Sequence, residues 1–421
     1  TLYLSSAASD VYKRQIIFSN RYLSGHKRVQ GLLSESMNRN DPSSFAGQLS
    51  AASERPPPVF VGSDVYRRRA YGFNHPLNIV RHSAVVDLLQ MLGWLNDDQF
   101  RESEPASVAQ LIDFHDRAYV RALQYANSTG SVVPSSRQRY QIGTFENPLF
   151  PGLFERATMT VGGSILAAEL AAEGPVAFHP SGGTHHGRPD RASGFCYLND
   201  PVFAILKLLE LGREHVLYID LDAHHGDGVE DAFYEEQRVT TLSIHEQNRW
   251  PYSGTRSHPH AGAYNFSVPQ QFNDTEFEFL MQHAVLPMAA ADDVDALVIC
   301  CGADCLSGDP LSHMQLSNVA LWDAVMQLID LGRATVVLGG GGYNPWTVTR
   351  YWSGLWGRIA GKELPDKLSA EASAFMRQME CDLIDEEDID EQWLTTIADT
   401  PYPGPVRDEI RSLVDIARAQ R

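Results

Sequence analysis

The chain has 421 residues, of which 43% are hydrophobic and 21% are charged, and its formal net charge is −19 at pH 7. This composition is typical of a globular protein, and the acidic excess disfavours direct nucleic-acid binding, because the phosphate backbone selects basic surfaces. No run of about 18 apolar residues occurs, so we expect neither a membrane span nor a membrane partner. The five cysteines are odd in number and form no C-x-x-C pair, which favours reduced thiols and a cytoplasmic location.

Composition divides the chain into four segments. Residues 1–36 lack an initial methionine and read as translated non-native sequence, so we expect a non-native or disordered leader before Met37. Residues 37–58 are polar and end in three prolines, which predicts an extended arm. We expect residues 59–365 to form one folded domain, and residues 366–421 to form an acidic, mostly helical extension packed on it.

From residue 59 onward, short apolar β-rich runs alternate with stretches of helical pattern. This alternation predicts a single-domain α/β fold with a mostly parallel central sheet flanked by helices. The expected strands cover residues 176–178, 215–222, 239–245, 295–301 and 334–338. The expected helices cover residues 156–172, 199–211, 275–291 and 316–331.

Polar or glycine-rich residues follow the carboxyl ends of four expected strands. These segments cover residues 179–187, 220–227, 302–304 and 339–343. In an open parallel sheet the ligand site lies beyond the carboxyl ends of the strands. The four segments therefore predict one shared site.

Asp222 and His224 are the first candidates for metal binding. Side chains alternate along a strand, so Asp220, Asp222 and His224 point to the same side. Asp304, after a neighbouring strand, can supply a third ligand. Two carboxylates and one imidazole leave a position open for water, as in catalytic zinc sites. The alternative is that these residues only form turns and caps, but the four converging segments favour the metal.

The adjacent His185 and His186 are candidates for proton transfer. Hydrolysis by an activated water requires a base for the water and an acid for the leaving group, and histidine serves both near neutral pH. Asp220 and Asp227 remain after metal ligation, so two His–Asp pairs can form. In isolation, two neighbouring loop histidines would more often lie at the surface.

Tyr343 follows four glycines, at positions 339–342. Glycines let the backbone approach a ligand closely, and a tyrosine hydroxyl placed there can donate to a developing oxyanion. A phosphate-binding loop is disfavoured because no Lys-Ser/Thr follows the glycines. The absence of G-x-S-x-G disfavours a serine hydrolase.

Five stretches together resemble the zinc-dependent histone deacetylase superfamily, which includes bacterial acetoin-utilisation proteins and acetylpolyamine deacetylases. They are GGTHH (182–186), ASGFCYLND (192–200), YIDLDAHHGDGVE (218–230), LSGD (306–309) and GGGGY (339–343). The resemblance implies an arginase/deacetylase-like fold, with residues 59–365 as the catalytic domain. It also implies a zinc-dependent amidohydrolase that removes acetyl groups from lysine side chains of proteins or, alternatively, from small acetylated amines such as acetylpolyamines.

The resemblance assigns roles to the residues singled out above. The implied ligands of zinc, for which ferrous iron is an alternative, are Asp222, His224 and Asp304. The implied catalytic groups are His186 with Asp227 as general base and acid, His185 with Asp220 as electrostatic partner, and Tyr343. The resemblance also implies a structural potassium ion beside the zinc, at Asp220, Asp222, His224 and Ser243.

The resemblance also implies a substrate tunnel. Its implied residues are Glu146, Gly194, Phe195, Trp250 and Leu311. Phe195 and Trp250 match its aromatic walls, Leu311 matches its mouth, and Glu146 matches an acidic rim residue that holds the substrate backbone. Residues 252–256 depart from the glycine-threonine-glycine segment of the family.

Two rival interpretations remain open. An arginase-type ureohydrolase carries D-x-H-x-D and two metal ions, but Gly226 stands here at the position of the last carboxylate, which favours a single metal. A non-catalytic acetyl-lysine-binding protein would be expected to lack metal ligands, a His–Asp pair or the tyrosine, and all of these residues are present.

Overall fold

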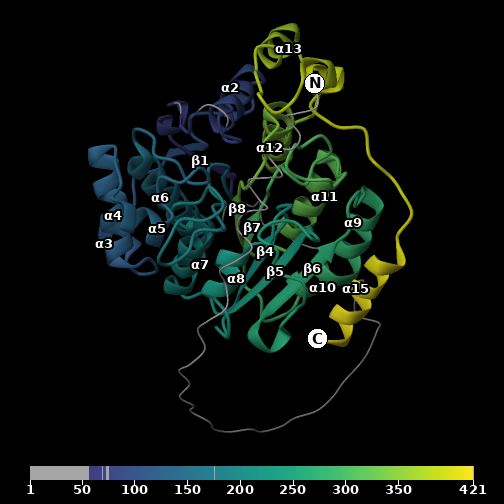
Figure 1. The fold of residues 1–421 in the computed structure, drawn as a ribbon. Helices are drawn as coiled ribbons and strands as arrows, with labels where there is room; N and C mark the ends of the chain where they lie inside the picture. Colours follow the sequence, from purple (N-terminus) through teal and green to yellow (C-terminus); the bar gives the residue numbers. More distant parts are fainter. Residues whose placement is uncertain (1–55, 69, 73–74, 175, 421) are drawn as a thin grey trace, which may run out of the picture. The chain divides into compact units, whose positions relative to one another are not determined.

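Eight parallel strands form one sheet in the computed structural model. The structure describes residues 56–420, except 69, 73–74 and 175. The expected leader and most of the expected arm lie outside the described residues. The strand order is β2-β1-β3-β8-β7-β4-β5-β6 (Figure 1). The strands are β1 (Val59–Gly62), β2 (Phe100–Glu102), β3 (Ala177–His179), β4 (Val216–Asp220), β5 (Val239–Glu246), β6 (Ala263–Val268), β7 (Ala296–Cys300) and β8 (Ala334–Leu338).

The predicted α/β class and parallel sheet are confirmed, and the five expected strands correspond to β3, β4, β5, β7 and β8. The prediction did not include β1, β2 or β6. The expected strand at 215–222 was too long, because β4 ends at Asp220. Asp222 and His224 therefore lie in the loop that follows β4, where strand alternation no longer governs the direction of a side chain.

The central strands are apolar on both faces because helices cover both sides of the sheet, as expected for parallel strands. In β4, Leu217 and Ile219 belong to the larger hydrophobic core. Val216 and Tyr218, which alternate with them, belong to the core on the opposite face. A third cluster packs around Leu123 and Val161 of two neighbouring helices.

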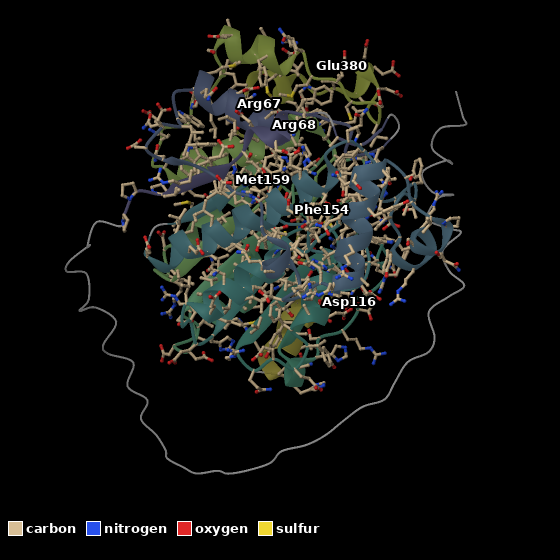
Figure 2. All side chains as sticks on the ribbon, turned by 90° about the vertical axis from the view of Figure 1, so that its left-hand side faces the viewer. Arg67, Arg68, Asp116, Phe154, Met159 and Glu380 are labelled. Carbon is tan, nitrogen blue, oxygen red and sulfur yellow. The ribbon has the colours of Figure 1, made fainter. Side chains whose placement is uncertain are left out.

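The α-helices are α2 (His82–Met91), α3 (Val108–Leu111), α4 (Arg117–Thr129), α5 (Pro134–Tyr140), α6 (Leu153–Ala172), α7 (Asp200–Glu210), α8 (Asp227–Ala232), α9 (Asp274–Leu280), α10 (Leu286–Ala289), α11 (Asn318–Ile329), α12 (Pro345–Ile359), α13 (Ala370–Met376), α14 (Glu391–Thr395) and α15 (Asp408–Ala419). The π-helical turn η3 (Met281–Val285) joins α9 to α10. Short 3-10 turns are η1 (Asp64–Arg67), η2 (Pro259–Ala261) and η4 (Glu386–Asp388). Figure 2 shows Phe154 and Met159 of α6 on the face that also carries Arg67 of η1. None of the helices in the described part of the chain is long and apolar enough to span a membrane.

Two helix starts fix loops that carry predicted site residues. The Asn199 side chain caps α7 by accepting a hydrogen bond from Val202 N, and Pro201 lies in the first turn. The Asn344 side chain accepts hydrogen bonds from the amides of Trp346 and Thr347 at the start of α12. Each cap satisfies backbone donors that a helix leaves unpaired, and each lies close in sequence to a residue predicted to function.

The C-terminal extension packs on the domain, although irregular stretches separate its helices. Apolar residues of α13, α14 and α15 belong to the larger core, and Figure 1 shows the chain running down to α15 beside α9. Arg350 of α12 is fully buried and ties this extension down. Its guanidinium donates to Asp399 Oδ1 at 2.5 Å, to Thr396 O at 2.7 Å and to Ala398 O at 2.9 Å.

We expect Arg350→Met to lower the free energy of unfolding by about 3–5 kcal/mol, because it leaves the buried Asp399 carboxylate without its cation. Urea denaturation followed by circular dichroism measures the change. Arg377→Met is the matched control, since its ion pair with Glu391 lies at the surface and should contribute little. Equal stability losses in the two variants would contradict the assigned role of Arg350.

Candidate active site

The four predicted site segments converge because their strands are neighbours. β3, β8, β7 and β4 are adjacent in the sheet and parallel, so their carboxyl ends lie along one edge. Backbone contacts join the loops that follow: Gly339 N donates to His179 O at 3.2 Å, and Ala303 N donates to Gly341 O at 2.8 Å. The predicted convergence is therefore present in the structure.

Asp222, His224 and Asp304 form one buried cluster. Their ligand atoms all lie within 4.8 Å of one another. His224 Nδ1 is 2.8 Å from Asp304 Oδ2 and 3.2 Å from Asp222 Oδ1. Backbone amides hold the carboxylates, since Gly341 N donates to Asp222 at 2.6 Å. Ala223 N donates to Asp304 at 3.0 Å. The fold itself keeps the three predicted ligands together.

Two glycines provide the space that the carboxylates of this cluster occupy. A Cβ atom at Gly341 would lie 2.1 Å from Asp304 Oδ2, and one at Gly302 would lie 2.2 Å from Asp222 Oδ2. Any other residue would therefore displace a carboxylate. The backbone forms a close-fitting cradle, and its two carboxylates and one imidazole are donors that suit a divalent cation.

The two buried carboxylates of the cluster also require a nearby positive charge. Burial raises the pKa of Asp304, and the nearby Asp222 raises it further. Burial acts on Asp222 in the same direction, but the charges of His185 and His224 outweigh it and lower the pKa of Asp222. Burial lowers the pKa of His224, whereas its hydrogen bonds to both carboxylates raise it to about 10. A bound cation would supply the charge that the imidazolium otherwise provides, so the residues fit a metal.

His185 and His186 form the two expected His–Asp pairs. His185 Nδ1 lies 2.7 Å from Asp220 Oδ2, and His186 Nδ1 lies 2.7 Å from Asp227 Oδ1. The two imidazole rings are 3.9 Å apart between centroids, and both are buried. Because each Nδ1 faces a carboxylate, Nε2 is the ring atom left for other partners.

Their surroundings push the two histidines toward different protonation states. Burial lowers the pKa of His185, but Asp220 and Asp222 together raise it to about 9. Burial and the charge of His185 lower the pKa of His186 to about 4, although Asp227 opposes them. At neutral pH His185 is therefore a cation and His186 a neutral base. Titratable neighbours with separated pKa values are typical of acid–base centres.

Sequence reasoning missed two residues that support these pairs. Arg188 forms ion pairs with Asp227 and Asp231, and it helps to hold the pKa of the buried Asp227 at about 2. The Tyr218 hydroxyl donates to Asp220 Oδ2 at 2.6 Å. Strand alternation could have identified Tyr218, because it lies two positions before Asp220 in β4. No spacing rule points to Arg188.

Tyr343 is buried beside the cation cluster. Its ring centroid lies 6.5 Å from that of His224 and 5.9 Å from that of Phe195. Its backbone N–H donates to Asp309 Oδ2 at 2.7 Å, so the aspartate of the LSGD segment fixes the tyrosine loop. The sequence resemblance included this segment but gave Asp309 no role.

Two aromatic rings flank the catalytic groups, as expected. The Trp250 ring centroid lies 4.5 Å from that of His186 and 6.4 Å from that of His224. Phe195 lies in a tight turn closed by hydrogen bonds between Ser193 and Cys196, with φ +55° at Gly194 and +66° at Phe195. These angles match a type I′ turn, which favours glycine.

Gly194 itself is required by space. A Cβ atom there would lie 2.4 Å from the Trp250 ring and 2.5 Å from the His186 ring. Its amide donates to Glu146 Oε1. The predicted rim carboxylate of Glu146 thus also holds the turn that presents Phe195.

The mouth residue Leu311 belongs to a network that the sequence did not reveal. The buried Glu246, at the end of β5, accepts from Arg249 at 2.7 and 2.9 Å and from His313 N at 2.7 Å. Arg249 also donates to Leu311 O. The network joins the Trp250 loop to the Leu311 loop, two segments predicted to border the substrate tunnel.

The residues implied for potassium lie next to one another. Ser243 is the register partner of Asp220 across β4 and β5, and its hydroxyl lies 2.9 Å from His245 Nδ1. Asp222 N donates to Asp220 Oδ1, and His224 N donates to Asp222 Oδ1. The potassium ion itself stays a prediction.

His225 points away from the cation cluster. It lies 2.8 Å from Ser253 Oγ and 2.9 Å from Glu230 Oε2. A Cβ atom at Gly254 would lie 2.6 Å from its ring, so His225 packs under the segment that departs from the family pattern. It supports a loop and does not join the donor set.

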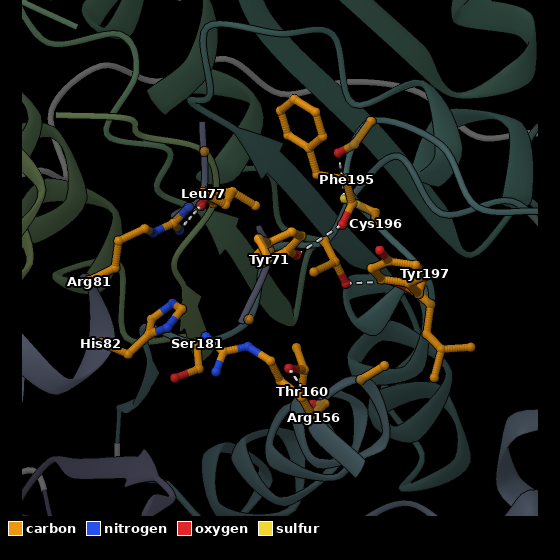
Figure 3. Close-up of a pocket in the computed structure, with 18 of the residues that line it drawn as sticks. Tyr71, Leu77, Arg81, His82, Arg156, Thr160, Ser181, Phe195, Cys196 and Tyr197 are labelled. Carbon is orange, nitrogen blue, oxygen red and sulfur yellow. Dashed lines mark hydrogen bonds between the residues drawn. The ribbon is translucent and has the colours of Figure 1, made fainter. Parts of the chain in front are cut away.

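A cavity of about 110 Å³ adjoins the catalytic groups. His185, His186, Gly341 and Tyr343 line it, and so do Arg81, just before α2, and Arg156 of α6. Figure 3 shows both arginines reaching into this space. We call it the arginine cavity. The sequence resemblance pointed to neither arginine.

Comparisons with known proteins agree with this geometry. The family model "Histone deacetylase domain" matches residues 75–359. Acetoin utilization protein AcuC of Bacillus subtilis (strain 168) is 33% identical over 327 residues, which cover 73% of this chain and 84% of that protein. Histone deacetylase 8 of Xenopus tropicalis is 31% identical over 297 residues, which cover 68% of this chain and 80% of that protein.

A solved structure of an HDAC homologue from Aquifex aeolicus has the same fold. Its TM-score is 0.82 at 32% identity, and the match covers 86% of this chain and 100% of that chain. An HDAC homologue complexed with SAHA matches with the same values. The predicted resemblance is thereby confirmed, and the chain belongs to the histone deacetylase domain family.

Proposed function

We propose that this chain hydrolyses the acetyl amide of N-acetyl-lysine side chains in proteins, releasing acetate and the free amine. Family membership makes it a deacetylase-type amidohydrolase. One observation supports acetyl-lysine as the substrate. Two His–Asp pairs and Tyr343 surround one cation cluster, between the rings of Phe195 and Trp250. An extended alkyl chain ending in an amide suits such a passage between aromatic rings.

We assign zinc to Asp222, His224 and Asp304, with ferrous iron as the alternative. Bound there, the metal would act as a Lewis acid toward the amide carbonyl and would lower the pKa of water. The support is the buried donor set and its glycine cradle. A second metal of the arginase type has no carboxylate at Gly226, where a Cβ atom would lie 2.2 Å from Asp220 Oδ2.

His186 would move the proton. Its Nδ1 faces Asp227, so Nε2 takes the proton from the attacking water and later gives it to the departing lysine amine. The low pKa of His186, about 4, keeps the imidazole neutral before the reaction. Asp227, itself paired with Arg188, holds the ring orientation throughout.

Tyr343 and His185 would stabilise negative charge. The Tyr343 hydroxyl donates to the carbonyl oxygen as it becomes an oxyanion, which is an interaction stronger in the transition state than in the substrate. His185, whose pKa is raised by its partner Asp220, would contribute positive charge beside His186. Phe195 and Trp250 exclude water around the acyl-lysine chain.

Tyr343→Phe should lower kcat on an acetyl-lysine peptide by about 10²–10³-fold, the usual loss for one oxyanion donor, while zinc content stays unchanged. Tyr125→Phe is the matched control, because Tyr125 is half exposed on α4. Steady-state kinetics and elemental analysis give the two readouts. Wild-type turnover in Tyr343→Phe would remove the tyrosine from the mechanism.

The purified chain should hold one zinc ion, and Asp304→Asn should lose it on dialysis, because a neutral amide is a weaker ligand than a carboxylate. Asp366→Asn, at an exposed position, is the control. Mass-spectrometric metal analysis measures the stoichiometry. Two tightly bound divalent ions per chain would instead favour the ureohydrolase interpretation.

An acetyl-lysine peptide should be hydrolysed with at least about tenfold greater kcat/KM than acetylspermidine. The exposed Phe145 and Tyr252, adjacent in sequence to the Glu146 rim and near Trp250, offer apolar surface to the residues that flank a lysine. The two substrates are compared on one enzyme preparation. A preference for acetylspermidine would replace protein lysine with a small amine as the substrate.

A further inference from the structure

The two guanidinium groups of the arginine cavity have no acidic partner among the described residues. Arg81 donates to Gly340 O at 2.5 Å and lies over the Trp352 ring, 5.0 Å from its centroid. Arg156 lies over the Tyr66 ring, 4.9 Å from its centroid. These contacts fix both side chains in place. The carboxylate whose charge acts on Arg81 is that of Asp304, which we assign to the metal.

Two like charges facing one buried space are unfavourable. Burial lowers the pKa of both guanidiniums, and nearby tyrosines oppose this effect at each of them. At Arg81 the charge of Asp304 also raises the pKa, whereas the charge of Arg156 lowers it. An arginine nevertheless keeps its proton at neutral pH, so both remain charged. An anion between them would offset the desolvation and the mutual repulsion together.

The buried acid of the adjoining loop is already engaged. Asp200 accepts from Ser164 Oγ at 2.5 Å, from Gly183 N at 3.0 Å and from Thr184 N at 2.7 Å. Its carboxylate therefore holds the glycine-histidine loop, and among the described residues it forms no ion pair with either arginine. With Asp304 assigned to the metal, a ligand is a natural source of further negative charge.

The remaining wall of the cavity defines what that ligand looks like. Part of this wall is apolar, namely Leu77, Ile79, Phe150, Leu153 and Ala157, and polar side chains such as Tyr71, His82, Thr160 and Ser181 line the rest. The apolar part suits methylene groups, and a pair of guanidiniums suits a carboxylate through charge-assisted hydrogen bonds. Because His185, His186 and Tyr343 line the same cavity, a group that enters it can be continuous with the amide being cleaved.

We propose that the arginine cavity receives the far end of an acyl group that terminates in a carboxylate, so that the enzyme also removes short dicarboxylic acyl groups, such as succinyl, from lysine. Water adds its oxygen to the acyl carbon, the C–N bond breaks, the amine takes the proton, and the dicarboxylate leaves. This inference rests on the proposed lysine deacylation, since the amide must occupy the same catalytic centre.

The test compares three peptides that differ only in the acyl group on one lysine: acetyl, succinyl, and the isosteric succinamoyl group with a neutral terminal amide. We expect the wild-type enzyme to hydrolyse the succinyl peptide with kcat/KM at least tenfold above that of the succinamoyl peptide. Equal or lower activity on the succinyl peptide would overturn the inference. Hydrolysis of the acetyl peptide tests the underlying deacetylation separately, and its absence would overturn that function as well.

Arg156→Met provides the second readout, because Arg156 makes no hydrogen bond with the glycine loop, whereas Arg81 does. It should lower kcat/KM on the succinyl peptide by about 10–100-fold, the usual effect of losing a hydrogen bond to a charged group, and Arg156→Lys should restore part of it. The exposed Arg117→Met on α4 is the charge-matched control. Equal losses on the acetyl and succinyl peptides would assign Arg156 a structural role only.

Inhibition by free carboxylates shows whether the cavity binds the acyl group of the substrate or the released product. Succinate should inhibit the wild-type enzyme more strongly than acetate, and Arg156→Met should weaken inhibition by succinate. If acetate inhibits as strongly as succinate and the succinyl peptide is not cleaved, the cavity binds the released product and the proposed acyl specificity is wrong.

Discussion

Four buried aspartates at one edge of the sheet determine the organisation of this site. Asp220, Asp222, Asp227 and Asp304 are each almost fully buried, and ionised carboxylates in such surroundings require compensating charge. Asp220 faces His185, Asp222 and Asp304 face His224, and Asp227 faces both His186 and Arg188. The groups that compensate the buried charges are the same groups to which we assign the proposed chemistry.

The same constraint explains why two adjacent histidines differ. Both imidazoles are buried and both face a carboxylate at 2.7 Å. Asp220 accepts a hydrogen bond from the neutral hydroxyl of Tyr218, whereas Asp227 already forms an ion pair with the guanidinium of Arg188. His185 therefore keeps most of the stabilisation that Asp220 and Asp222 offer, and its charge then holds His186 neutral. This difference underlies the separate roles that we propose for the two histidines.

Most of the candidate site could be predicted from the sequence. Parallel strands place their carboxyl ends together, and the residues that follow these ends are aspartates, histidines, glycines and a tyrosine, which are typical of catalytic and metal sites. The residues predicted as metal ligands, His–Asp pairs, oxyanion donor and aromatic walls were all named, and the structure places them close together, while their roles stay predictions. The prediction of Asp222 and His224 from strand alternation reached the right cluster although β4 ends before them. A hydrogen-bonded loop, and not the strand, sets their direction.

What could not be predicted depends on contacts between segments far apart in the chain. Arg188 meets Asp227 across 39 positions, and Arg249 joins Leu311 across 62. Arg81 and Arg156 come together only because the segment before α2 and helix α6 border one cavity. Such residues carry no local pattern, since arginine is ordinary on any exposed helix and is conspicuous only once its burial is known.

The strand order has a consequence for how the protein matures. β4 lies near the middle of the chain, and its neighbours β7 and β8 follow it in the sequence. Both must pair into the sheet before Asp304 and the glycine loop can contact the segment around Asp222. Such long-range parallel pairing is slow relative to local helix formation. A nascent or partly folded chain thus lacks the cation cradle, so the proposed metal would bind late, after assembly of the sheet. Its binding energy would then favour only molecules whose last central strand is in register.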